Sequence, residues 1–335
     1  MVSYGLGDLA QSFLLQRRGA ALKVEMTRLN EELASGQISD IKSVLAGNVS
    51  YLSDIEGDLR TLSGYKVATI EAAQFASSAQ SALERIDAGV GTLSAALITA
   101  SSSAVGPVLD QMSVDAQIEL NSMVTALNTS SGGRSLFAGT ATDQPALNDA
   151  NSILADLRVA IAGATTVDTI SSAVDAWFDD PAGFRASAYT GSDNSIAAFQ
   201  LAEDEQVSIG LKADDAVFRT LLKGTALAAI AADDGLGLSG AEQQELLERA
   251  GTRLFEAQSD LTAVRGNLGS AEARIDTIAT RNAARDTSLQ FAKGALLQAD
   301  PYDTATQLEA VQFQLQSLYT ITARMSDLSL VNFVR

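Results

Sequence analysis

Residues 254–278, LFEAQSDLTAVRGNLGSAEARIDTI, carry the strongest periodic pattern in this chain of 335 residues. The apolar positions are Leu254, Leu261, Val264, Leu268, Ala271, Ile275 and Ile278. Spacings of three, four and seven place such residues in one stripe along one side of an α-helix. A single amphipathic helix in water leaves that stripe uncovered, so the pattern predicts a long helix that packs along a second one.

A second long pattern lies in the first half of the chain. From Tyr51 to Leu127 the apolar residues keep a helical spacing, with a break near Val105-Gly106-Pro107. Taken as one helix, this stretch has about 80 residues and is roughly 120 Å long at 1.5 Å per residue. Even with the break, we expect two long rods. Residues 51–127 and 243–297 are therefore predicted to pack on each other.

Two shorter amphipathic helices are predicted at residues 1–35 and 304–335. The first ends at Ser35-Gly36, and Thr304 with Gln307 forms a capping box for the second. Helices of this length do not bury their stripes alone, so we expect them to be poorly ordered in a free monomer and to order on assembly. The residues predicted to make the assembly contacts are Leu15, Leu22, Met26, Leu29, Leu33, Leu308, Val311, Leu315, Leu318 and Met325.

The middle of the chain differs in composition from the segments on either side. Residues 141–240 hold 15 acidic and five basic side chains, which is −10 of the total net charge of −18. We expect this acidic part to be the most exposed. The local patterns predict helices near 149–162, 167–178 and 216–232, a β-hairpin over 195–212, and a Ser239–Glu242 capping box that opens the next helix.

The expected fold is mainly α. It is a long antiparallel helical rod, a coiled-coil-like bundle of N- and C-terminal segments, with an inserted small α+β domain. Residues 1–40 with 300–335 form the terminal helices of the assembly core. Residues 41–135 with 241–299 form the rod domain, and residues 136–240 form the inserted acidic outer domain.

The composition excludes many functional classes. A net charge of −18 disfavours binding to nucleic acid or to an anionic membrane surface. The chain has no cysteine and no histidine, which removes disulfides, thiol nucleophiles, the usual zinc ligand sets and the commonest general base. Neither a cleaved secretory signal at residues 1–8 nor an apolar run long enough for a bilayer is visible. We expect no catalytic site, no metal and no cofactor.

Two kinds of motif could suggest a ligand. Three Gly-x-Gly elements, at residues 5–7, 89–91 and 235–237, neither follow a clear strand nor complete a phosphate-binding motif. The acidic pairs at residues 179–180, 214–215 and 233–234 could hold calcium or form an acid and base pair. Because the alternating ligands of a calcium loop are missing, exposed loop carboxylates and helix caps explain these pairs better.

Several segments resemble the bacterial flagellin superfamily. The pair Arg28-Leu29 before Ser35-Gly36 resembles the family's N-terminal segment, and Arg265-Gly266-Asn267-Leu268-Gly269 resembles its C-terminal rod signature. Residues 133–140, with Gly133, Phe137 and Gly139, resemble the segment that closes the first rod in the hook-filament junction proteins. The first dozen residues match neither class.

The resemblance implies a structural subunit of the flagellum that joins hook to filament and assembles through its terminal helices. It also implies as partners other copies of the chain, filament flagellin, another hook-associated protein on the hook side, and an export chaperone that covers the C-terminal helix. The expected location is extracellular, after type III export without a cleaved signal. The alternative is a filament flagellin; a third possibility is a helical enzyme that uses the carboxylates of residues 141–240, with a raised pKa in a concave pocket.

Overall fold

The computed structural model describes residues 5–41, 49–101 and 106–333. The fold is mainly α, as the sequence predicts, with small antiparallel sheets. The chain divides into two compact units, one formed by residues 1–61 with 284–335 and the other by residues 62–283. Two long helices contribute to both units: α3 (Val49–Ser101) and α9 (Gly240–Leu297).

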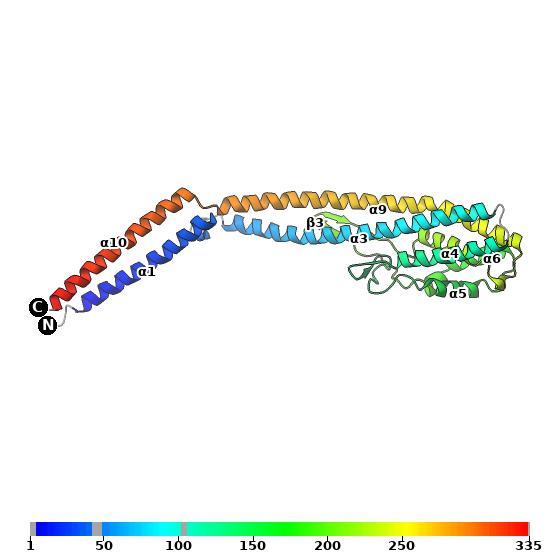
Figure 1. Cartoon of the computed structure of the whole chain (residues 1–335), viewed down its shortest axis with the longest axis horizontal. Helices are drawn as coiled ribbons and strands as arrows, with labels where there is room; N and C mark the ends of the chain where they lie inside the picture. Colours follow the sequence, from blue (N-terminus) through cyan, green and yellow to red (C-terminus); the bar gives the residue numbers. More distant parts are fainter. Residues whose placement is uncertain (1–4, 42–48, 102–105, 334–335) are drawn as a thin grey trace. The chain divides into compact units, whose positions relative to one another are not determined.

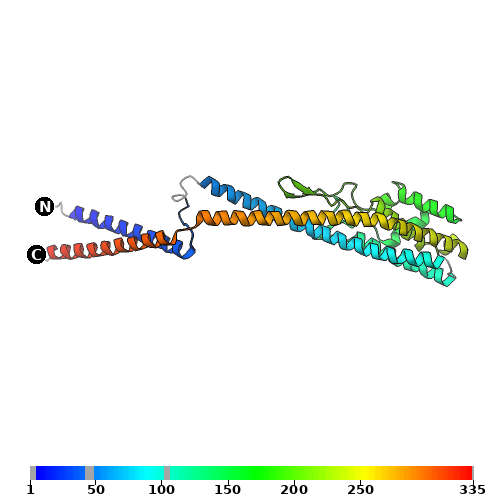
Figure 2. The same cartoon turned by 90° about the horizontal axis from the view of Figure 1, so that it is seen from above.

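In the first unit, α1 (Gly5–Ser35) and α10 (Pro301–Phe333) lie side by side and antiparallel (Figures 1 and 2). Leu29 of α1 and Leu308, Leu315 and Leu318 of α10 are buried. At the other end of this unit, Leu52 of α3 packs on Leu297 of α9. Apolar side chains from the two ends of the chain thus form the core of one unit.

A short backbone pairing joins the end of α1 to the start of α10. Gly36 has φ +68, a conformation that glycine adopts without strain, and its N–H donates to Glu32 O at 2.8 Å. The Ala299 N–H donates to Gly36 O at 2.9 Å, and Ile38 N–H donates to Leu297 O at 2.9 Å. The predicted break at Ser35-Gly36 is therefore a glycine helix cap that also fixes the opposite chain end.

The predicted start of α10 is wrong by three residues. Asp300 accepts hydrogen bonds from the N–H groups of Tyr302 at 2.8 Å and Asp303 at 3.2 Å, so it caps the helix that begins at Pro301. The Thr304 hydroxyl instead donates to Asp300 O at 2.8 Å from inside the first turn. A proline in the first turn favours this earlier start, because its missing N–H has no partner to lose there.

In the second unit, α3 and α9 run antiparallel over residues 62–101 and 240–283. A Cβ on Gly91 would meet Gln258, and one on Gly251 would meet Leu97 at 3.0 Å. Beyond the Gly91 contact, Arg265 donates to the Asp87 carboxylate. Glycines on the contact face let the two helix backbones come close, and they set the register of the pair.

Of the two alternatives for residues 51–127, the pair of helices with a break near Gly106-Pro107 is confirmed, and the single helix of about 80 residues is wrong. Helix α3 ends at Ser101, and α4 (Gly106–Leu127) runs back along it, since Gly89 of α3 faces Glu119 of α4 and Ser78 faces Ser131. Pro107 lacks an N–H donor, so it would break a hydrogen bond in the middle of a continuous helix, whereas in the first turn of α4 no hydrogen bond is lost. The apolar face of α4 is instead covered by α8 (Ala216–Ala229), where Ser113 Oγ donates to Ala228 O at 3.0 Å.

The three helices predicted in the acidic segment are confirmed. They are α5 (Ala150–Ala160), α6 (Val167–Asp179) and α8. Asp149 and Thr166 cap α5 and α6, and the predicted Ser239–Glu242 capping box is present before α9. Phe137, Phe178, Phe184 and Phe218 are fully buried in a core that is continuous with α3, α4 and α9. The two compact units divide the chain at other residues than the predicted three domains do. The three-part domain division stays a prediction.

The predicted hairpin over 195–212 is confirmed, although its strands are short. Strands β3 (Phe199–Ala202) and β4 (Glu205–Val207) pair antiparallel beside the long helices (Figure 1). The Asn282 side chain of α9 donates to Leu201 O at 2.8 Å, and the rings of Phe75 and Phe199 lie 5.7 Å apart. Sequence reasoning did not find α7 (Phe184–Ser187), the 3-10 helix η1 (Asp234–Leu236), or the two-residue strands β1 (Ser130–Ser131) and β2 (Arg134–Ser135).

Gly139 lies where the segment after β2 crosses residues 192–194. Its φ is +61, and a Cβ would come within 2.4 Å of Asn194 O and 2.7 Å of Ser192 O. The neighbouring N–H groups of Thr140 and Ser192 donate to Asn194 O and Ala138 O, both at 2.9 Å. Glycine is therefore required here for its conformation and for its size.

We predict that Gly139→Ala destabilises the chain far more than Gly132→Ala. Gly132 also has a positive φ, +58, but no atom lies within 4 Å of its Cβ position. Gly132→Ala should cost about 1–2 kcal/mol from backbone strain alone. Gly139→Ala should cost at least about 2 kcal/mol more, because two backbone oxygens must move. Urea unfolding followed by the fluorescence of Trp177, the single tryptophan, measures both; equal losses would contradict the account.

Candidate assembly surface on the terminal helices

The predicted assembly residues line the seam between α1 and α10. Leu29, Leu308, Leu315 and Leu318 are buried there. The half-buried ones are Leu15, Leu22, Met26, Val311 and Met325. Leu33 is 42% exposed. The structure therefore covers most of this stripe within the chain, and the role of these residues in assembly stays a prediction.

A different set of apolar side chains is exposed on the same two helices. Apart from Leu33 and the first-turn residue Tyr302, they are Phe13, Leu14 and Val24 on α1 and Phe313, Tyr319 and Ile321 on α10. Val24 and Phe313 are each 71% exposed. Isolated exposed apolar residues are ordinary, but six large ones on two adjoining helices are typical of a surface that binds another protein. We call these six residues the outer apolar face.

The outer apolar face adjoins a shallow groove between the two helices. Its volume is about 380 Å³, and its lining includes Leu15, Leu22, Phe313, Leu318 and Ile321. Arg18 stands at its edge. At the same level, Gly19 is buried, and a Cβ there would lie 3.1 Å from Leu318 Cδ2. The absence of a side chain at Gly19 lets α10 approach α1 closely.

The family-like motif at the end of α1 has a structural role. Arg28 donates to the Glu25 carboxylate and, at 2.6 Å, to Glu32 Oε1. Glu32 is only 5% exposed, and the same oxygen accepts the Ser39 N–H at 2.8 Å. The hydrogen bond from Arg28 lowers the pKa of the Glu25 carboxyl. This network connects the last turn of α1 to the residues that follow Gly36.

The other motif residues lie in the second unit and also have structural explanations. Gly133 is in the turn of the β1–β2 hairpin, Phe137 packs edge-on against Phe218 at 5.8 Å, and Gly139 is the crossing point described above. Arg265 pairs with Asp87 across α9 and α3. Gly269 lies within α9, with no atom near its Cβ position. These residues hold the fold and do not form one common site.

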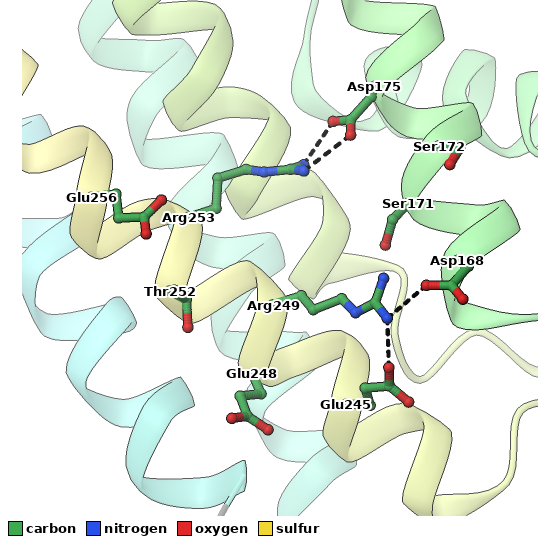
Figure 3. A pocket seen from close by; sticks show the side chains of 10 residues that line it. All are labelled: Asp168, Ser171, Ser172, Asp175, Glu245, Glu248, Arg249, Thr252, Arg253 and Glu256. Atoms are coloured by element: carbon green, nitrogen blue, oxygen red, sulfur yellow. Dashed lines mark hydrogen bonds and ion pairs between the residues drawn. The ribbon is translucent and has the colours of Figure 1, made fainter.

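A polar cleft of about 620 Å³ lies where α6 meets α9 in the second unit (Figure 3). Arg253 pairs with Asp175 at 2.9 Å. Arg249 pairs with Asp168 at 2.7 Å and Glu245 at 2.6 Å. Carboxylates of the chain thus pair with both guanidinium groups. These ion pairs fasten α6 to α9.

A second cavity, of about 440 Å³, contains a carboxyl group with a raised pKa. Burial against α3 raises the pKa of Glu119 to about 7. A Cβ on Gly89 would lie 2.0 Å from Glu119 Oε1, which has no hydrogen-bond partner. The rest of the lining is Ala88, Thr92, Leu93, Ala96 and Asp115. This lining supplies no cation, and desolvation by helix packing accounts for the raised pKa of Glu119.

The acidic pairs in the second unit take part in caps and ion pairs. Asp233 caps η1 and accepts from Arg158 Nε at 2.6 Å, and Asp179 accepts from Lys223 Nζ at 2.8 Å. Burial raises the pKa of Asp215, which accepts the Lys212 N–H at 2.8 Å. Within residues 5–41, 49–101 and 106–333, no cluster of three or more potential metal ligands occurs. No helix in those ranges has the length and apolar character to cross a membrane.

The C-terminal helices match a known protein family region. Residues 253–334, which cover most of α9 and all of α10, match the bacterial flagellin C-terminal helical region. This segment is similar to a flagellin C-terminal region. This flagellin region includes Arg265 and Gly269, as well as the α10 half of the outer apolar face.

The fold is similar to that of two flagellar proteins. The chain superimposes with a TM-score of 0.52 on a chain assigned to the flagellar hook-associated proteins from Vibrio parahaemolyticus, at 14% identity, over 73% of this chain and 95% of that one. It superimposes with a TM-score of 0.53 on FlgL from Bacillus cereus, at 13% identity, over 72% of this chain and 99% of that one. At this identity the likeness shows the fold alone. No curated protein sequence matches the chain.

We predict that Phe313→Ser and Leu315→Ser separate assembly from folding. Phe313 is 71% exposed and Leu315 is 8% exposed on the same turn of α10. Phe313→Ser should leave the melting temperature nearly unchanged but weaken self-association at least about tenfold, because burying a phenylalanine contributes about 1.5–3 kcal/mol. Leu315→Ser should lower the stability of the helix pair by at least about 2 kcal/mol.

Circular dichroism melting and sedimentation velocity at several protein concentrations measure the two effects. The account of the outer apolar face would be contradicted if Phe313→Ser associated as strongly as the unchanged chain.

We predict that Glu119→Gln stabilises the second unit at pH 8 but not at pH 4.5. The pKa of about 7 in the folded chain is above the ordinary value of 4.5, so folding takes up a proton between these pH values. The unchanged chain therefore loses stability as pH rises from 4.5 through 7. Glu119→Gln should gain about 1–3 kcal/mol at pH 8. Urea unfolding at both pH values tests this, with exposed Glu84→Gln as the control; equal effects of the two changes would contradict it.

Proposed function

We propose that this chain is a structural subunit of the bacterial flagellum that joins the hook to the filament. The observation that carries the proposal is the fold, which resembles two hook-associated proteins over nearly their whole length, together with a flagellin C-terminal region in α9 and α10. Ion pairs of the chain line the cleft between α6 and α9, and packed residues of α3 and α4 line the cavity at Glu119. A mechanical role needs no reaction centre.

The mechanism begins with the outer apolar face. Each copy would cover the exposed side chains of α1 and α10 with those of its neighbours. Burial of one large apolar side chain stabilises a contact by about 1.5–3 kcal/mol, and every further neighbour adds the same term. Contacts between different faces of successive copies do not close into a dimer, so one kind of chain forms a ring or a tube.

The division of charge between the two units supports this arrangement. Residues 1–61 with 284–335 carry 10 basic and 13 acidic side chains, a net charge of −3, whereas residues 62–283 carry 13 basic and 28 acidic ones, a net charge of −15. The unit with the outer apolar face can pack closely with its copies at little electrostatic cost. The acidic unit resists close contact with its copies, which keeps it on the outside of an assembly.

The expected partners follow from the proposed position of the chain between the hook and the filament. Besides other copies of itself, the chain would contact filament flagellin on one axial side and another hook-associated protein on the other. Before export an export chaperone would cover the apolar C-terminal helix, since exposed apolar faces aggregate. The location is extracellular, in the flagellum, after export as an unfolded chain. A filament flagellin is the alternative function, and the flagellin C-terminal region fits it as well.

Deletion of the gene tests the proposal. Cells should then make finished hooks without filaments and release unassembled flagellin into the medium, because flagellin is exported but has nothing to assemble on. Electron microscopy of the cells and an immunoblot of the medium measure the two results. Filament loss without flagellin in the medium would identify the chain as the filament subunit. Normal filaments would contradict both functions.

A further inference from the structure

A basic segment lies on α1 in a chain that is otherwise strongly acidic. Residues 9–24 include Arg17, Arg18 and Lys23 and no acidic residue. Lys23 lies over the ring of Tyr319, with its Nζ 5.8 Å from the ring centre. Arg17 and Arg18 are exposed, and neither has an ion-pair partner in the part of the chain that the structure describes. Two charged groups next to the outer apolar face are thus available to a partner.

An acidic segment lies on the first half of α10. Residues 301–323 include Asp303 and Glu309 and no basic residue. Both carboxylates are exposed, and neither has an ion-pair partner among the described residues. Glu309 shares its helix side with Tyr302 and Phe313, at spacings of seven and four, as Arg17 does with Val24 and Phe13. The two helices therefore present similar apolar stripes with opposite central charges.

These opposite charges cannot meet within one chain. Gly19 lies beside Leu318 and Gln11 Nε2 donates to Met325 Sδ at 3.9 Å, so α1 and α10 are antiparallel with Arg17 near the level of residue 320 (Figure 1). Glu309 is level with residue 28, about ten residues away from Arg17 along the axis. At 1.5 Å per residue this offset is roughly 15 Å, too far for an ion pair.

We propose that the Arg17 stripe of one copy binds the Glu309 stripe of a second copy displaced along the helix axis by about 15 Å. This inference rests on the proposed assembly through α1 and α10 and specifies its register. The displacement brings Phe13, Arg17 and Val24 opposite Tyr302, Glu309 and Phe313. Each copy uses its Arg17 stripe on one neighbour and its Glu309 stripe on another, so the contact is heterologous and repeats from copy to copy without closing into a dimer.

Disulfide trapping tests the register directly. The chain has no cysteine, so every disulfide formed by Arg17→Cys with Glu309→Cys must join the introduced residues. A disulfide needs Cα atoms within about 7 Å, which the offset excludes inside one chain. We expect mild oxidation of isolated flagella to give a ladder of linked copies on a non-reducing gel. The control, Arg17→Cys with Gln316→Cys, keeps the same side of α10 but lies two turns further along, and should give little or no ladder.

Charge reversal provides the second measurement. Arg17→Glu alone and Glu309→Lys alone should each lower the amount of chain in the flagellar fraction by about two- to fivefold at low salt, because like charges then face each other. The two changes together should restore that amount. Failure of the combined change to restore it would overturn the pairing.

The trapping result separates this inference from the proposed function. If the Arg17/Glu309 cysteine variant is present in flagella but stays monomeric, or links no better than the Gln316 control, the register is wrong and the function stands. If the unchanged chain is absent from flagella, the proposed function fails. The same oxidation of the purified full chain then decides the register, since a ladder supports it and a monomer overturns it.

Discussion

An amphipathic helix in water cannot cover its own apolar stripe, and every part of this structure depends on that constraint. Helices α3 and α9 have 53 and 58 residues, so each needs a partner along most of its length. A segment from the other end of the chain supplies that partner, which brings the two ends together as α1 and α10. Those two helices bury one side against each other and leave another side apolar and exposed. In the proposed assembly, other copies of the chain cover that second side.

The two compact units differ in net charge and in their exposed apolar side chains. The second unit binds its arginines to its own carboxylates, as at Arg253 and Arg265, and keeps a large negative excess on its surface. The first unit has almost balanced charge and large exposed apolar side chains. In the proposed assembly, copies of the chain attract one another through the first unit and repel one another through the second. That combination favours an ordered tube over an irregular aggregate.

Periodicity predicts most of the helices, the hairpin at 195–212 and the caps at Ser239 and Gly36, because each depends on local spacing or local hydrogen bonds. It fails where contacts distant in sequence decide the outcome. The reversal between α3 and α4 depends on the cover that α8 gives to α4. The apolar stripe shows which helix side is buried but not whether the partner belongs to the same chain. The exposed residues Phe13 and Phe313 fall off that stripe, and their spacing alone did not mark them as a surface.

The position of the chain in the flagellum is the central claim, and immunogold electron microscopy measures it most directly. An antibody against the acidic segment, residues 141–240, is suited to this because the claim places that segment on the outside of the assembly. The account predicts gold particles in a narrow band where hook and filament meet, with none along the filament. Label along the whole filament would contradict the junction assignment and show the chain to be a filament subunit.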